Sequence, residues 1–114
     1  MTTNDTPSAD DQPSTHHTAV RKAFAHLGHE GRLLVLYDLQ TGSKRFTEIK
    51  RSTGLSAATL SRTLASLQAR TLITSRTAQT SHAATYYCLT EKGAALHEMF
   101  KTLEEQVTPA EWSE

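Results

Sequence analysis

The sequence predicts a mainly α-helical, α+β fold in which several helices are joined to one small β-hairpin. Apolar residues recur at helical spacing over most of the chain, and two short runs between residues 72 and 90 are rich in strand-favouring Thr, Ile and Tyr. A chain of 114 residues is expected to form one domain. The first 17 residues are polar and almost without apolar groups, so they are predicted to be disordered. The domain is therefore expected at 18–107, followed by a short tail at 108–114.

Two helices are predicted at the start of the domain. The first, about 18–27, is amphipathic, with Val20, Ala23, Phe24 and Leu27 on one face and Gly28 as its C-terminal cap. The second covers about 32–40 and is apolar all round, so we expect it to be the most buried helix. Gly42 is expected to end it.

A helix pair follows, joined by a tight turn. The first helix, about 46–53, has Phe46 and Ile49 facing inward, and Gly54 ends it. Ser56 is a good N-cap for the next helix because its hydroxyl can accept a hydrogen bond from a free backbone N–H. Leu55 and Leu60 occupy the positions of a hydrophobic staple across this cap. The inner face of the second helix is formed by Leu60, Leu64 and Leu67.

The remaining elements are a hairpin and a last helix. Residues 72–77 and 84–90 are predicted strands, joined by a polar, small-residue connection. Thr90 is expected to cap a helix over 91–107. Its apolar stripe consists of Leu96, Met99, Phe100, Leu103 and Val107. The stripe could pack on its own domain or pair with a second copy. We favour the second copy, because a small domain is not expected to cover the stripe fully, and predict a homodimer interface here, with Phe24 and Leu27 as further candidates.

This order of helix, turn, helix and hairpin is typical of a winged helix-turn-helix. Charge supports a partner with phosphates. The chain has no formal net charge, but residues 18–90 contain ten Lys or Arg against three acidic residues, a balance of +7. Residues 1–17 carry −3 and residues 91–114 carry −4. The basic excess therefore lies where the helix pair and hairpin lie, which favours double-stranded DNA as a partner.

The motif residues resemble prokaryotic winged-helix transcription regulators, and most closely the HxlR family. The resemblance rests on the run from Lys44 to Arg51, on the leucines and serines of the second helix, and on Tyr87-Cys88-Leu89-Thr90 with Gly93. It covers about residues 27–96. Two features differ from that family: Glu30-Gly31 stands where Lys-Trp is usual, and an N-terminal cysteine is absent. Arg32-Leu33 is more similar to the ArsR family, and Ser61-Arg62, the wing and Thr90 are shared with MarR-type proteins.

Such a fold places its second helix in the major groove, which predicts the residues that meet DNA. On that helix they are Ser56, Ala58, Thr59, Ser61, Arg62 and Thr63. Arg62 is the best candidate for a base edge, because a guanidinium can pair with guanine in bidentate fashion. A contact of Arg62 with a phosphate alone is the alternative. Phosphate or wing contacts are expected from Lys44, Arg45, Lys50, Arg51, Arg76 and His82. Each set could also be an ordinary solvated face.

Other functions have little support in the sequence. The sequence contains no activated nucleophile and no phosphate-binding loop that would indicate an enzyme, and it implies no cofactor. The six His residues and Cys88 lack the spacing of a metal site, and a lone strand cysteine is more often a packing residue than a redox switch. No signal peptide or membrane span is expected, so the protein is predicted to be cytoplasmic. Two alternatives stay open: a protein-interaction module that does not bind DNA, and a regulator gated by a ligand, a metal or redox chemistry. Any small-molecule effector is unknown.

Overall fold

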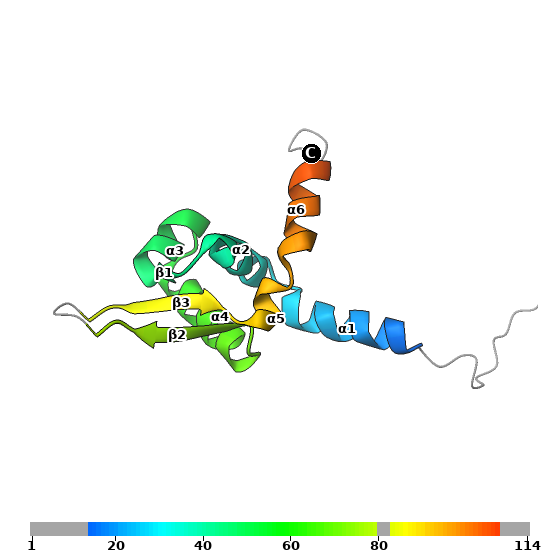
Figure 1. Ribbon diagram of the computed structural model, residues 1–114, viewed down its shortest axis with the longest axis horizontal. Helices are drawn as coiled ribbons and strands as arrows, with labels where there is room; N and C mark the ends of the chain where they lie inside the picture. The colour runs from blue at the N-terminus through cyan, green and yellow to red at the C-terminus, as the bar shows by residue number, and fades with distance from the viewer. Residues whose placement is uncertain (1–13, 80–82, 108–114) are drawn as a thin grey trace, which may run out of the picture.

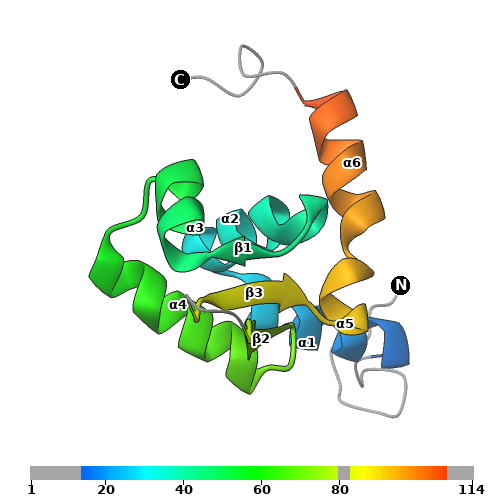
Figure 2. The ribbon, with the colours of Figure 1, turned by 60° about the vertical axis from the view of Figure 1, so that its left-hand side comes forward.

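The computed structural model describes residues 14–79 and 83–107, in which helices pack around a three-stranded antiparallel sheet (Figures 1 and 2). The elements in chain order are α1 (Thr15–Leu27), α2 (Glu30–Asp38), the 3-10 helix η2 (Leu39–Thr41), β1 (Lys44–Arg45), α3 (Phe46–Thr53), α4 (Ala57–Ala69), β2 (Ile73–Thr77), β3 (Thr85–Leu89), α5 (Glu91–Ala94) and α6 (His97–Gln106). The predicted fold class, α-helices with a small β element, is confirmed.

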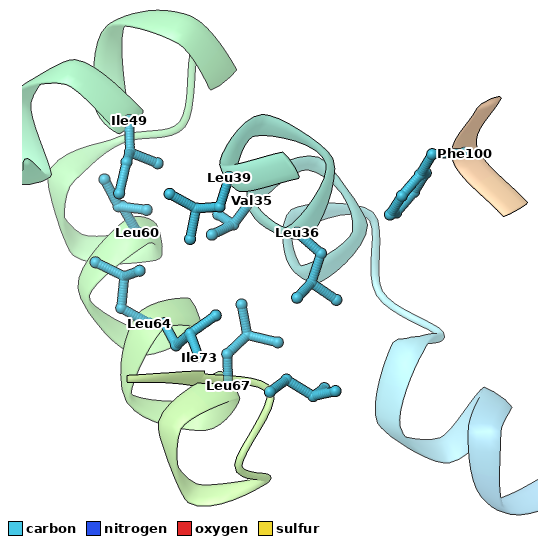
Figure 3. Packing of buried hydrophobic residues seen from close by; sticks show 10 residues of the cluster. Val35, Leu36, Leu39, Ile49, Leu60, Leu64, Leu67, Ile73 and Phe100 are labelled. Carbon is cyan, nitrogen blue, oxygen red and sulfur yellow. The ribbon is translucent and has the colours of Figure 1, made fainter. Parts of the chain in front are cut away.

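The core lies between α4 and the α2–η2 segment. Leu60, Leu64 and Leu67 point from α4 toward this segment, as expected from their spacing, and all three are buried (Figure 3). Their partners across the core are Val35, Leu36 and Leu39. The core is completed by Ile49 from α3, by Leu72 and Ile73 at the start of the hairpin, and by Phe100 from α6. Burial of these side chains, worth roughly 1.5–3 kcal/mol each, fixes the orientation of α4.

The turn between α3 and α4 forms as the sequence predicts. Gly54 ends α3 with φ of 75°, a left-handed conformation that favours glycine. Ser56 Oγ then accepts a hydrogen bond from the N–H of Thr59 at 3.1 Å. Thr53 adds a link that was not predicted, because its hydroxyl donates to the Ile49 carbonyl and accepts from the N–H of Leu55. These hydrogen bonds therefore fix the chain at the start of α4.

The sheet has one strand more than the predicted hairpin. β1 pairs with β3, with Lys44 opposite Tyr87 and Arg45 opposite Tyr86, which gives the strand order β1-β3-β2. A strand of two residues has no periodicity of its own. The hydrogen-bond partners of β1 come from β3, which is distant in the sequence, so the local sequence could not predict β1.

The first helix begins earlier than predicted. α1 starts at Thr15, because Ser14 Oγ accepts a hydrogen bond from the N–H of His17 at 3.1 Å. The predicted disordered tail over 1–17 is therefore wrong for residues 15–17, and its remainder up to residue 13 is outside the described residues. Gly28 caps the helix as predicted: its N–H donates to the Phe24 carbonyl, and a Cβ there would stand only 2.6 Å from that oxygen.

The second helix is less buried than predicted. Val35 and Leu36 are buried, but Leu33 and Leu34 are half-buried and Tyr37 is exposed, whereas α4 buries four residues. The reason is geometric. α1 and α6 run away from the body in different directions, so they leave one face of α2 without cover (Figure 1). The high apolar content of this helix reflects two apolar faces, one packed in the core and one open.

The predicted C-terminal helix over 91–107 is in fact two helices. Thr90 caps α5 as expected, with its hydroxyl accepting from the N–H of Gly93 at 3.2 Å. The chain then turns at Ala95 and Leu96 before α6 begins. α5 is held against the hairpin, where the missing side chain of Gly93 admits the Leu72 carbonyl, while Phe100 of α6 is held against α2. These two attachments point in different directions, which a single straight helix could not satisfy.

Candidate nucleic-acid interface

The face of α4 that points away from the core consists of small, hydroxylated and basic residues. Ala58, Ser61 and Arg62 are exposed, and Thr59 is half-buried. The guanidinium of Arg62 lies 3.5 Å from the Thr59 hydroxyl, which is a long hydrogen bond that leaves its other donors open. Ser56 is exposed at the start of the helix, although its hydroxyl is occupied in capping. The small side chains on this face allow close approach, and its hydroxyl and guanidinium groups are donors suited to contact with base edges.

Thr63 does not belong to this face. It is only 8% exposed, and its hydroxyl oxygen lies 3.2 Å from where a Cβ of Gly31 would stand. The geometry therefore gives no support to its predicted contact with DNA. Its side chain lies beside Gly31, so it points toward α2 rather than outward.

Basic side chains surround α4 on two further elements. Lys50 and Arg51 are exposed in the last turn of α3, Arg45 is exposed just before that helix, and Arg76 is exposed on β2. Within residues 14–79 and 83–107, none of these four cations has a carboxylate at ion-pair distance. Their charges are therefore free to meet phosphates. His82, also predicted for the wing, is outside the described residues.

Lys44 does not share this freedom. Its Nζ lies 2.7 Å from Oδ1 of Asp38, and both side chains are largely covered. The geometry gives no support to the predicted phosphate contact of Lys44, because its ammonium group is engaged with the end of α2. Neighbouring positions on a strand point to opposite sides of the sheet, so Arg45 remains exposed while Lys44 does not.

A large apolar groove lies where α1, α2 and α6 diverge. Its volume is about 710 Å³. The apolar residues that line it are Phe24 and Leu27 from α1, Leu33, Leu34 and Tyr37 from α2, and Met99, Phe100 and Leu103 from α6. Phe24 is 68% exposed and Leu103 is 50% exposed. Two separate predictions for a dimer interface, on the first and last helices, therefore fall on one continuous surface.

Three members of the predicted dimer interface behave differently. Phe100 lines the groove but is mostly buried within its own chain, and Leu96 packs against the core. Val107 follows the end of α6 and is half-buried outside the groove. Leu33, Leu34 and Tyr37 were not predicted to line this surface. They lie on the helix that was expected to be the most buried one, and only the directions of α1 and α6 expose them.

Tyr37 attaches α6 to α2. Its ring meets that of Phe100 edge to face, with centroids 5.5 Å apart and planes at 70°. Its hydroxyl also donates a hydrogen bond to Glu104, and this hydrogen bond and the charge of Glu104 raise the pKa of Tyr37. These contacts fix one wall of the groove.

The histidines and the cysteine form no metal site among the described residues. No three His, Cys, Asp or Glu side chains among them are placed to hold a metal ion. Cys88, the one cysteine in the sequence, is a half-buried free thiol on β3. None of the helices in the described parts of the chain combines the length and the apolar character that crossing a membrane requires.

The part of the chain that contains α2, α3, α4 and the hairpin matches a known family. The HxlR-like helix-turn-helix family model matches residues 26–112. The chain belongs to the HxlR-like helix-turn-helix family. This confirms the branch that the motif residues indicated. No curated protein sequence matches the chain significantly.

Solved structures of transcription regulators share the fold of this HxlR-like protein. The reduced form of the regulator YodB from Bacillus subtilis has a TM-score of 0.70 at 27% identity, over 84% of this chain and 93% of that one. The repressor BigR from Xylella fastidiosa has a TM-score of 0.64 at 27% identity, over 81% and 93%. A MarR-family regulator from Enterococcus faecalis, at 20% identity and a TM-score of 0.69 over 91% and 89%, shares the fold alone. Family and neighbours together support a DNA-binding transcription regulator.

Proposed function

We propose that this chain is a homodimeric transcription regulator that binds double-stranded DNA sequence-specifically, with α4 in the major groove. The observation that carries the proposal is the outer face of α4. Ala58, Ser61 and Arg62 stand exposed on a helix whose opposite face is fixed in the core. Small side chains allow close approach to the bases, and a hydroxyl and a guanidinium provide donors for base edges.

The surrounding cations would set the register on the duplex. Lys50 and Arg51 at the end of α3, and Arg45 before it, would meet phosphates beside the major groove. Arg76 lies on β2 opposite Tyr86, on the hairpin that serves as the wing. With one exposed arginine on its described part, the wing is suited to the DNA backbone or the minor groove rather than to reading several bases.

A second copy of the chain is the proposed occupant of the apolar groove. Phe24 and Leu103 expose large apolar surfaces on opposite walls, and a two-fold axis would allow α1 or α6 of each copy to cover the groove of the other. Such a dimer can place two α4 helices about 34–36 Å apart, one turn of DNA. A pseudo-palindromic site is the expected target.

Salt dependence of binding to duplex DNA tests the proposal. Several phosphate contacts should make log K fall with log salt by about 0.9 per contact. Arg51→Gln should make this slope shallower by about one contact. Lys101→Gln, which also removes one exposed positive charge but lies on α6, should leave it unchanged. No binding even at low salt would overturn the proposal in favour of a protein-interaction module.

A further inference from the structure

A cluster of basic side chains lies where the ends of α1 and α4 meet α5 (Figures 1 and 2). Its members are His26 from α1, Arg32 from α2, Arg70 at the C-cap of α4 and Lys92 from α5. Nη1 of Arg32 donates to the His26 carbonyl at 3.2 Å, and Nζ of Lys92 donates to the Arg70 carbonyl at 3.2 Å. Burial, and then the charges of the other three residues, lower the pKa of His26, so all of them lie near its imidazole.

No carboxylate compensates this cluster within the described residues. Neither His26 nor any of the three cations has an Asp or Glu oxygen at ion-pair distance there. The last carbonyls of α1 and α4, at the negative ends of the helix dipoles, offset part of the charge of Arg32 and Lys92. Helix-end carbonyls carry only partial charges, so an excess of positive charge remains at this junction.

Two side-chain nitrogens of the cluster are buried without a hydrogen-bond partner among the described residues. They are Nδ1 of His26 and Nε of Arg70. An arginine Nε is always a donor, and a histidine Nδ1 is a donor in the protonated ring. Where the chain supplies no partner for such a group, a bound ion or water is the expected partner. Both side chains are only half-buried, so the junction is within reach of solvent.

We infer that this junction binds a small free oxyanion, a molecule that carries a carboxylate or phosphate group. Oxygens of that group would accept hydrogen bonds from Nε of Arg70 and from protonated Nδ1 of His26, and such charge-assisted bonds are strong. Lys92 is exposed and would attract the anion from solvent. A water molecule would satisfy one nitrogen but would leave the excess charge, which an anion removes.

The junction is separate from the proposed DNA surface. Arg70 follows Arg62 on the same helix, about 12 Å further along its axis. The helices α1 and α5 carry none of the expected DNA contacts. The inference therefore does not rest on the proposed function.

Inorganic phosphate is the probe. In NMR titrations at constant ionic strength, it should shift the Nε–H signal of Arg70 and the imidazole signals of His26 along one saturating curve. It should also raise the measured pKa of His26, because an anion stabilises the protonated ring. Acetate, titrated in the same way, distinguishes a site for carboxylates from one for phosphates. The absence of saturable shifts with both probes would overturn the inference.

Two variants with matched controls locate the site. Lys92→Gln should weaken phosphate binding about three-fold, because Lys92 is exposed. Arg70→Lys keeps the charge but loses the Nε donor, so it should weaken binding about ten-fold. Lys101→Gln on α6 and Arg76→Lys on β2 make the same changes at exposed positions outside the cluster and should have no effect. Equal losses in variants and controls, or no loss in either variant, would overturn the inference. Amide spectra report folding, and Lys92→Gln, at an exposed position, decides the matter if Arg70→Lys does not fold.

Affinity for duplex DNA separates this site from the DNA surface. In chloride buffer without phosphate, Lys92→Gln should bind DNA as Lys101→Gln does. A loss as large as that of Arg51→Gln would make the junction part of the DNA contact and overturn the inference. If the wild type bound no DNA at all, the proposed function would fail, and the phosphate titration would still test the site.

Discussion

Lys44 and Asp38 form an ion pair, with Nζ 2.7 Å from Oδ1, that ties β1 to the end of α2. The other carboxylate oxygen of Asp38 is buried and has no hydrogen-bond partner among the described residues. Among the described residues, Lys44 is the one cation at ion-pair distance from this carboxylate. Arg45, the next residue, is exposed and has no such partner in the described parts of the chain.

We expect Lys44→Met to destabilise the fold without weakening DNA binding. Loss of the ammonium leaves a largely covered carboxylate unpaired, which costs roughly 1–3 kcal/mol. Arg45→Met should show the opposite pattern, with little change in stability and weaker binding. Urea denaturation and DNA titration of both variants measure this. A loss of affinity for folded Lys44→Met equal to that of Arg45→Met would restore Lys44 to the DNA surface.

Arg62→Ala should weaken binding to a selected specific site by roughly 1–3 kcal/mol and affect random DNA less, if the guanidinium pairs with a base. The specific site can be obtained by selection from a random duplex library. Gln68→Ala, an exposed truncation on the same helix, is the control. Equal losses on both DNAs would assign Arg62 to a phosphate, and no loss on either would show that α4 does not carry recognition.

Leu103→Glu should separate the dimer. Leu103 is 50% exposed in the single chain, so the substitution is tolerated there, but a second copy over the groove would bury the new charge at a cost of several kcal/mol. Thr102→Glu adds the same charge to an exposed α6 residue that does not line the groove. Light scattering gives the mass of both variants. A Leu103→Glu protein that stays dimeric would place the interface elsewhere.

If Leu103→Glu separates the dimer, its affinity for the selected DNA site should fall as well. Two half-sites bound at once gain far more than any single phosphate contact provides. A folded Leu103→Glu monomer that kept wild-type affinity would contradict the paired half-site arrangement.

His26 predicts a pH effect on stability. Burial, followed by the charges of Lys92, Arg70 and Arg32, lowers its pKa below 6.5, and its Nδ1 is buried without a partner in the described residues. The unfolded chain therefore binds the proton more readily. The stabilisation from neutral His26 is complete above about pH 6.5 and is lost as the pH falls below that value. His26→Gln should lose less Tm than the wild type between about pH 7.5 and about pH 5. Parallel losses would exclude this role.

Local chemistry determined the elements of this protein. The leucine spacing of α4, the Gly54–Ser56 turn and the Thr90 cap act within one or two helical turns, so sequence alone predicted them, and with them the family and the outer face of α4. The basic excess around these elements is likewise a property of composition.

Only the tertiary structure decided which side chains remain available. Thr63 and Lys44 fit the predicted DNA surface by sequence position, but α2 covers one and Asp38 engages the other. The pairing of β1 with β3 and the groove formed by α1, α2 and α6 join residues far apart in the chain. The break between α5 and α6 follows from their contacts with different distant elements. Burial and ion pairing of a side chain depend on which elements pack together, and no local pattern of residues encodes that packing.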